Sequence, residues 1–344
     1  MSVGYQQILP DLAEYRAAWL KMGFNLPLSC VPWRTEGLLR VLPRPLSPFA
    51  RQGWPWERET PPFASAAADW PLITIVTPSY QQGEYLEETL RSVLLQNYPR
   101  LEFIVIDGGS TDASRTILER YRPWLSFARS ERDRGQSHAI NRGFSLGSGE
   151  IFGWINSDDF YLPGTLQRVA QAWRNGAEFI HGDLVVLEQS TEKLTYVPAN
   201  LARSRYVRFP GLVAQATAFW SADRHQPLWE EQHCALDYEL WIRLLPGLRL
   251  SCLREPLALA RSHEAAKTSN PAMKQQWDAD GQRNGLAHPR LYETTVANWW
   301  LQREYKLVQR FQQFRQKREI ASRLATLQRT CGWPDRSGNM APLS

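Results

Sequence analysis

Two adjacent carboxylates, Asp158 and Asp159, follow the apolar run 151–155 after only two polar residues, and the chain then turns at Pro163 and Gly164. A short apolar run bounded by turn residues predicts a buried strand, which places the two acids just beyond its carboxyl end. Ligands of open α/β sheets bind at the carboxyl ends of the strands. The cysteines and histidines are dispersed along the chain, so a metal ion bound here would be held mainly by carboxylates.

Three other polar loops accompany the predicted strands. They are 77–80, 107–112 and 133–136, with the sequences Thr-Pro-Ser-Tyr, Asp-Gly-Gly-Ser-Thr-Asp and Asp-Arg-Gly-Gln. Parallel strands end at the same edge of a sheet, so we expect the four loops to meet there. Core packing does not require four polar loops at one edge, and we interpret them as parts of one binding site.

The segments between these loops alternate between predicted strands and predicted helices. Continuous runs of apolar and β-branched residues predict strands, and apolar residues at a spacing of three or four predict helices. The predicted strands are 72–77, 103–106, 125–129, 151–155 and 178–181, and the predicted helices are 84–96, 113–121, 137–146 and 164–173. This alternation predicts an α/β fold with a mainly parallel sheet flanked by helices. A further amphipathic helix is predicted over 237–245, in a more aromatic part of the chain.

The chain divides into three predicted parts. Residues 1–70 are rich in Pro, Trp and Arg with one predicted helix at 12–22, and we expect an extension wrapped over the central domain. Residues 71–270 are the predicted α/β domain. Residues 271–344 are a predicted basic helical extension, with apolar residues at helical spacing at Trp300, Leu307, Phe311 and Phe314. This stripe has two interpretations: the helix docks on the central domain, or it makes a peripheral contact with an anionic membrane.

The positive charge of the chain lies mostly in its last part. The formal net charge is +5, but residues 289–344 contain 10 Lys and Arg against 4 Asp and Glu, so the preceding residues are nearly neutral. This distribution argues against nucleic acid as a partner. No segment approaches the roughly 18 consecutive apolar residues of a membrane span, and the N-terminus lacks the features of a secretion signal. We therefore expect a cytoplasmic protein.

In its polar loops the chain resembles the family-2 glycosyltransferases with the GT-A fold, which is built on a Rossmann-like sheet. Those enzymes move a sugar from a nucleoside diphosphate to an acceptor. The resemblance covers roughly residues 72–269 and leaves both extensions outside. It rests on five motifs in the family's order, which are Thr77-Pro-Ser-Tyr80, Asp107-Gly-Gly-Ser-Thr-Asp112, Asp133-Arg-Gly-Gln-Ser-His-Ala-Ile-Asn141, Asn156-Ser-Asp-Asp159 and Asp237-Tyr-Glu-Leu-Trp241.

The resemblance implies a site for a nucleotide-sugar donor, with a uridine diphosphate sugar expected. The donor-binding residues that it implies are Pro78, Tyr80, Asp107, Gly135, Gln136, Asp158, Asp159, His263 and Lys267. Asp107 is expected to accept a hydrogen bond from the ring N–H of a uracil-type base. Asp112 is expected to cap the next helix instead. His263 and Lys267 lie in a segment that looks like the loop closing over the donor in related enzymes, where Lys267 would add positive charge.

Asp158 matches the metal-binding aspartate of the family. A divalent cation, Mn²⁺ or Mg²⁺, would neutralise the charge that grows on the leaving diphosphate. His263 is the expected second protein ligand, and Asp159 is expected to contact the donor sugar or to orient Asp158. Asn156 stands where the family's motif usually has an aspartate, so the cation is expected to be held more weakly or chiefly by the diphosphate. The alternative is that the two acids only cap the helix after Pro163.

Asp237 matches the general base of the family. Inversion at the sugar carbon needs a base opposite the leaving diphosphate, where it takes the proton of the acceptor hydroxyl. Leu236 replaces the acid that usually precedes this base, and Glu239 is expected to face elsewhere because positions i and i+2 diverge on a helix. The alternative is that Asp237 only caps the helix that it opens.

The acceptor is expected to be a glycan or a lipid-linked sugar. Candidates for an aromatic wall on which its rings would stack are Trp220, Trp229 and Trp241. Two other functions stay open. A sugar nucleotidyltransferase would need a glycine-rich basic loop after the first strand, but residues 77–83 contain neither Lys nor Arg. A catalytically inactive transferase-like module that binds a glycan or a protein partner is the other, and Asn156 and Leu236 favour it.

Overall fold

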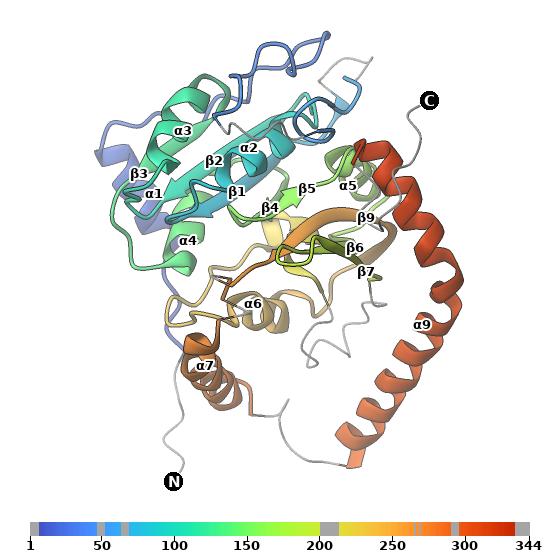
Figure 1. Ribbon diagram of the computed structural model, residues 1–344. Coiled ribbons are helices and arrows are strands. Elements are labelled where there is room, and N and C mark those ends of the chain that lie inside the picture. Colours follow the sequence, from blue (N-terminus) through green and yellow to red (C-terminus); the bar gives the residue numbers. More distant parts are fainter. Residues whose placement is uncertain are drawn as a thin grey trace.

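The computed structural model describes residues 7–46, 52–62, 69–199, 213–264, 266–267, 270–289 and 296–333. Within this part of the chain, nine strands form one sheet in the order β3-β2-β1-β4-β8-β6-β9-β5, with β7 paired to β6. Helices lie against both faces of this sheet, as Figure 1 shows. The α/β fold and the GT-A-type arrangement expected from the sequence are confirmed.

The first half of the sheet is parallel and contains the strands predicted from continuous apolar runs. These strands are β1 (Ile73–Ser79), β2 (Leu101–Asp107), β3 (Phe127–Ser130) and β4 (Ile151–Trp154). β1 pairs in parallel with β2 on one side and with β4 on the other. Every residue of β1 and β2 is buried, which is usual for parallel strands covered by helices on both faces.

The second half of the sheet is mixed, and most of it was not predicted. It contains β5 (Phe160–Tyr161), β6 (Phe179–Glu188), β7 (Lys193–Val197), β8 (Phe219–Ser221) and β9 (Leu250–Ser262). β8 pairs antiparallel with both β4 and β6, whereas β9 pairs in parallel with β6. The sequence predicts only the first residues of β6 here. β9 was missed, although it is the longest strand and leads directly to His263.

The strands of the parallel half send alternate side chains to two hydrophobic clusters. In β2, Phe103 and Val105 join the cluster under helices α2 (Leu86–Leu94), α3 (Ser114–Tyr121) and α5 (Thr165–Arg174). Ile104 and Ile106 join the opposite cluster, under α4 (Gln136–Leu146) and α6 (Leu236–Leu244). This alternation follows from the period of two along a strand. All five helices were predicted, within a few residues at their ends.

The N-terminal extension packs on both sides of the sheet. Its helix α1 (Leu12–Lys21) lies on α4, and the buried Trp19 donates from Nε1 to Ser145 Oγ at 3.1 Å. The predicted helix at 12–22 is therefore confirmed. Further along, Trp54 is buried and donates from Nε1 to the carbonyl of Tyr161 at 2.8 Å.

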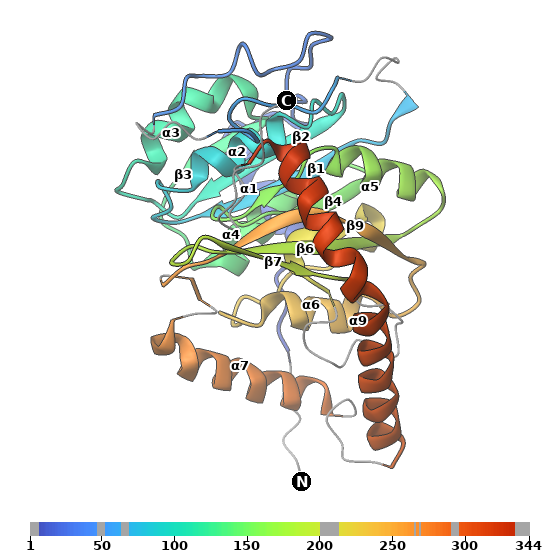
Figure 2. The same cartoon turned by 45° about the vertical axis from the view of Figure 1, so that its right-hand side comes forward.

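The C-terminal extension contains helices α7 (Lys274–Ala287) and α9 (Val296–Cys331). In Figures 1 and 2, α9 runs along one side of the molecule, from α5 down to the level of α7. Its final turns are docked, because Cys331 is fully buried and its carbonyl accepts a hydrogen bond from Trp54 N at 2.7 Å. Trp299, Trp300 and Leu307 in its first half are exposed.

The predicted stripe on α9 is thus divided. The docking interpretation holds for the end of the helix and for Tyr305, which is buried in the cluster under α4 and α6. Trp300 and Leu307 face solvent, and the side chains of Phe311 and Phe314 lie outside the described residues. A membrane contact through this helix stays a prediction. Among the described residues, no helix is both long enough and apolar enough to span a bilayer.

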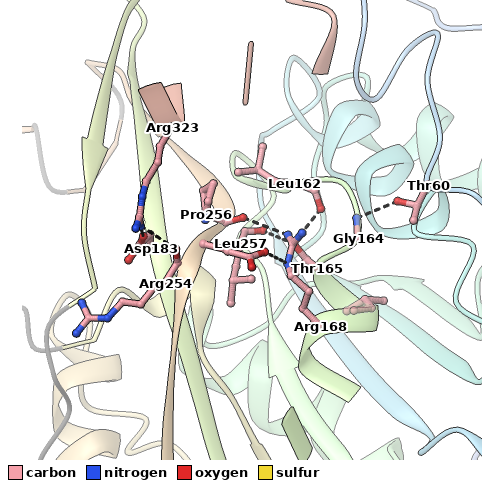
Figure 3. A network of polar contacts seen from close by, with 12 residues as sticks. Thr60, Leu162, Gly164, Thr165, Arg168, Asp183, Arg254, Pro256, Leu257 and Arg323 are labelled. Atoms are coloured by element: carbon pink, nitrogen blue, oxygen red, sulfur yellow. Dashed lines mark hydrogen bonds and ion pairs between the residues drawn. The ribbon is translucent and has the colours of Figure 1, made fainter. Parts of the chain in front are cut away.

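A buried ion pair holds the end of α9 to the sheet. Arg323 donates to Asp183 Oδ2 at 3.2 Å and to the carbonyl of Arg254 at 2.8 Å, as Figure 3 shows. Asp183 is fully buried in β6 and also accepts hydrogen bonds from Tyr196 and the Ala199 amide. If Arg323 is removed, the Asp183 carboxylate stays buried without its charged partner. The folded state then still carries the free-energy cost of taking this charge out of water.

We therefore expect Arg323→Ala to lower the free energy of unfolding by about 1–3 kcal/mol, measured by urea denaturation. Arg329→Ala is the matched control, because Arg329 is exposed on the same helix and its side chain bonds only to Thr326 within the described part of the chain. Its expected effect stays within about 0.5 kcal/mol. Equal effects of the two substitutions would show that the ion pair does not hold the helix.

Candidate active site

A cavity of about 420 Å³ and a larger one of about 600 Å³ lie in the described part of the molecule. The larger one lies at the carboxyl ends of β1 and β2 and beside the loop after β4, where the polar loops were expected to meet. Seven of the nine predicted donor residues line it, namely Pro78, Tyr80, Gly135, Gln136, Asp158, Asp159 and Lys267. Asp107 and His263 are not among its lining residues.

Asp107 holds its own loop together. It is fully buried at the end of β2, and its carboxylate accepts hydrogen bonds from the Ser110 amide at 2.8 Å and from Ser130 Oγ at 2.6 Å. The Gly109 amide and the Ser110 hydroxyl add two further bonds. Its predicted contact with a nucleotide base stays a prediction. Asp112 accepts from the Ser114 amide at 3.0 Å, at the start of α3, as its expected capping role requires.

Asp133 lines the cavity and was not nominated from the sequence. A Cβ atom added to Gly108 would lie 3.1 Å from Asp133 Oδ2, so the missing side chain leaves room for this carboxylate. Burial raises the pKa of Asp133, although the Gly135 amide donates to its Oδ1 at 2.9 Å. Gly135 has a φ of 113°, which favours glycine and lets the loop turn into α4. In the sequence, the polar loop 133–136 was the feature that pointed to this residue.

Asp158 and His263 face one another. His263 Nε2 lies 3.2 Å from Asp158 Oδ2, and the imidazole is buried beside the Tyr85 ring. Neighbouring ligands around a cation with bond lengths of about 2.1 Å lie about 3 Å apart, so this pair fits two positions of one coordination sphere. Within the described residues, no three His, Cys, Asp or Glu side chains form a metal-binding group. Any further ligands would therefore come from other groups.

Asp159 is buried next to Asp158. Its Oδ1 accepts a hydrogen bond from the Arg261 amide at 3.0 Å, so the end of β9 fixes its orientation. Burial and the charge of Asp158 both raise its pKa well above the usual range of an aspartate. A positive charge placed between the two carboxylates would oppose both effects.

A chain of amide and ammonium contacts crosses the cavity. Asn156 Oδ1 accepts from Gln136 Nε2 at 2.8 Å, and Gln136 Oε1 accepts from Lys267 Nζ at 2.7 Å. Lys267 Nζ also donates to the carbonyl of His233 at 2.8 Å, in the loop before α6. Burial lowers the pKa of Lys267. The oxygen that Asn156 keeps in place of an aspartate is therefore already bonded to Gln136.

Asp237 lies in the first turn of α6, beyond the loop that Lys267 contacts, and is not among the lining residues. Its surroundings bury the carboxyl group and raise its pKa. Glu239 faces elsewhere, as expected, and is bonded through both oxygens to Arg243 at 2.7 Å. Burial alone would raise the pKa of Glu239, but the hydrogen bonds from Arg243 outweigh it and bring the pKa to about 2.

Comparison with known proteins points to one family. Residues 74–220 match the model of glycosyl transferase family 2. Over this stretch, which is less than half of the 344 residues, the chain is similar to that family. A glycosyltransferase of Rickettsia typhi, itself uncharacterized, is 26% identical over 218 residues, which cover 60% of this chain and 68% of that protein. The putative teichuronic acid biosynthesis glycosyltransferase TuaG of Bacillus subtilis is 33% identical over 101 residues, 28% of this chain and 40% of that protein.

A solved structure has a similar arrangement at low identity. Staphylococcus aureus TarS (residues 1–349), in complex with UDP-GlcNAc, is 17% identical with a TM-score of 0.47, over 63% of this chain and 70% of that chain. The family match confirms the resemblance over residues 74–220, which include four of the five motifs, whereas the fifth motif at 237–241 lies outside the match. This glycosyltransferase is therefore an enzyme. Its family match runs from β1 to β8 and leaves α6 and both extensions outside.

The three tryptophans considered for an aromatic wall in this glycosyltransferase do not form one. Trp220, Trp229 and Trp241 are each at most 3% exposed, and they belong to the interior. Trp241 stacks on Trp154 with ring centroids 5.7 Å apart and planes 15° apart. A buried ring and a ligand platform have the same appearance in a sequence, because both need large apolar faces.

Asp280, on α7, supplies the cap of the helix that carries Asp237. Its Oδ2 accepts from the amides of His233, Cys234 and Ala235 at 2.7–3.0 Å, and Asp280 is fully buried. These donors precede α6, whose first amides lack partners within the helix. The Asp237 carboxyl itself bonds to the amides of Tyr238 and Asp237, so the alternative that it also caps the helix stays open. Sequence reasoning missed Asp280 because it comes from a different helix.

Replacing Asp280 by Ala should lower the free energy of unfolding by about 1.5–3 kcal/mol, since three amides lose a charged acceptor. Sugar transfer should fall as well, because the start of α6 positions Asp237. Urea denaturation and initial rates measure the two effects. Asp278→Ala is the control, since Asp278 lies on the same helix and, among the residues that the structure describes, pairs only with exposed Lys274. An Asp280→Ala variant as stable as this control would contradict the capping role.

Proposed function

We propose that this glycosyltransferase transfers a sugar, with inversion, from a uridine diphosphate sugar to a hydroxyl of a glycan or lipid-linked acceptor. The observation that carries the proposal is the meeting of Asp158, Lys267 and the Gln136 loop at one cavity over the strand ends, with His263 against Asp158. A volume of about 600 Å³ lies within the roughly 300–1,000 Å³ of small-molecule sites. The family match supplies the class of reaction.

The donor would lie across the carboxyl ends of β1 and β2. Tyr80 is exposed at the mouth of the cavity, where its ring can cover the base, and Asp133 offers a carboxylate to the nucleoside. The diphosphate would approach Lys267 and Arg132, two of the basic side chains that line the cavity. Both acids at 158 and 159 face this side, so a bound anion needs a compensating positive charge.

Asp158 and His263 are the residues that would hold a divalent cation, with the diphosphate supplying further oxygens. Such a cation stabilises the negative charge of the leaving diphosphate without transferring a proton. Asp159 is held by the Arg261 amide and would contact the donor sugar. Asn156, bonded to Gln136, would keep the loop in place rather than bind the cation.

Asp237 would act as the general base. The acceptor oxygen forms a bond to the anomeric carbon, and the bond from that carbon to the diphosphate oxygen breaks with its electron pair leaving on the diphosphate. The proton of the acceptor hydroxyl passes to the Asp237 carboxylate. Burial raises the pKa of Asp237, which makes it a stronger base than an exposed aspartate.

The cation site is tested with Asp158→Ala. We expect the substitution to weaken Mn²⁺-dependent binding of UDP at least tenfold, about 1.4 kcal/mol, because one of two protein ligands is lost. His263→Ala should act in the same direction. Isothermal titration calorimetry with and without Mn²⁺ measures this, and Asp223→Asn, an exposed acid on the surface, is the control. Unchanged affinity in the Asp158→Ala variant would remove the cation from this position.

The base is tested with Asp237→Asn. Transfer should fall by about 10²–10⁴-fold while UDP affinity stays unchanged, because the amide cannot accept the proton. In the unaltered enzyme, kcat/KM should fall as the pH decreases, with a midpoint above the value of about 3.9 usual for aspartate, since the raised pKa keeps the base protonated to higher pH. Retained turnover of the Asn variant would place the base elsewhere.

A further inference from the structure

The second cavity, of about 420 Å³, lies outside the proposed donor site. Its walls come from the N-terminal extension, the start of α2, the β6–β7 hairpin and the end of the C-terminal extension. The two extensions meet at this cavity, where Trp333 donates from Nε1 to the carbonyl of Trp54 at 2.9 Å. The walls therefore include residues that the family match does not cover.

Aromatic rings form much of its lining. Trp56, Tyr85 and Trp333 come from three different segments and lie around one space. Trp333 is partly exposed, and the other two rings are nearly buried. Flat aromatic faces that border an open space bind the C–H faces of sugar rings, because both surfaces are apolar and rigid.

Polar groups lie between these rings. Glu84, Gln189 and Glu192 are exposed at the cavity, and Tyr85 donates from its hydroxyl to Gln189 Oε1 at 2.9 Å. Carboxylates accept hydrogen bonds from hydroxyl groups, and side-chain amides both accept and donate them. Together with Glu88, the lining holds three carboxylates against one guanidinium, that of Arg261. This surplus of negative charge opposes a phosphate or a uronic acid.

Arg261 connects this cavity to the donor cavity, because it lines both. Its guanidinium pairs with Glu88 and lies over the rings of Tyr85 and Phe160 at 5.1 and 5.3 Å. Its side chain is only 6% exposed, yet its Nε has no hydrogen-bond partner among the described residues. A buried N–H without an acceptor is costly.

We propose that this cavity, bordered by Trp56, Tyr85, Trp333 and Gln189, is a second carbohydrate site that binds an uncharged sugar unit of a glycan. Apolar rings and hydroxyl-binding groups in one wall match a neutral saccharide, whereas a lipid chain would desolvate the carboxylates without bonding to them. Because Arg261 also contacts Asp159, a sugar bound here lies beside the donor cavity. The second cavity is therefore placed to bind a non-reacting unit of the acceptor, and this role rests on the proposed function.

The test uses the full-length protein and a panel of uncharged tetrasaccharides of glucose and N-acetylglucosamine with α- and β-linkages. Saturation-transfer NMR identifies the binders, and calorimetry gives their affinities. We expect at least one to bind, and we expect Trp333→Ala and Gln189→Ala each to weaken it at least tenfold. Tetragalacturonate, which carries negative charge, is expected not to bind. Trp300→Ala is the control, because Trp300 is exposed on α9 away from this lining.

UDP affinity in the presence of Mn²⁺ is measured for every variant. Unchanged UDP affinity together with weakened tetrasaccharide binding supports a second site. If no uncharged tetrasaccharide binds to the unaltered protein, or if binding survives both substitutions, the carbohydrate site is refuted while the donor proposal stands. If UDP binding is absent from the unaltered protein but a tetrasaccharide binds through Trp333, the donor proposal fails and the second site stands.

Discussion

The parallel pairing of β1 with β2 and β4 is the constraint on which the rest of the structure depends. β1 is buried along its whole length, so its amides and carbonyls must bond to neighbouring strands. The register sets Ser79 opposite Asp107 at the ends of β1 and β2 and pairs Val76 with Trp154 near the end of β4. The polar loops that follow these strands are therefore brought to one edge, and the larger cavity lies above the strand ends, between the hydrophobic clusters on the two faces.

Segments outside the family match hold residues of the proposed reaction in position. Asp280 on α7 fixes the start of α6 and with it Asp237, while Lys267 connects that same loop to Gln136 at the cavity. The base and the donor loops are thus coupled through hydrogen bonds rather than through the sheet. At the other side, Trp54 bonds to Cys331, so the two extensions hold each other over the second cavity. In this proposal, the extensions belong to the site as well as to the scaffold.

The sequence predicts the parallel half of the sheet, its helices and the meeting of the loops, because continuous apolar runs and helical spacing are local signals. β9 was not predicted, because Arg254-Glu255-Pro256 is typical of an interruption between elements. In the sheet, Pro256 lies at an irregularity where the register with β6 shifts. Asp280 escaped because its partners lie more than 40 residues away. For the tryptophans the sequence left both core packing and a binding wall open, because composition does not distinguish a core ring from a binding surface. Asp133 needed the space left by Gly108, which only the fold reveals.

The central claim is that the cavity over the strand ends binds a nucleoside diphosphate together with a cation held by Asp158 and His263. A crystal structure of the protein with UDP and Mn²⁺, with anomalous data collected at the manganese edge, tests it most directly. The account predicts an anomalous peak within bonding distance of Asp158 Oδ2 and His263 Nε2, with the diphosphate beside Lys267 and the base near Tyr80. UDP bound in the second cavity, or manganese bound away from Asp158, would contradict it.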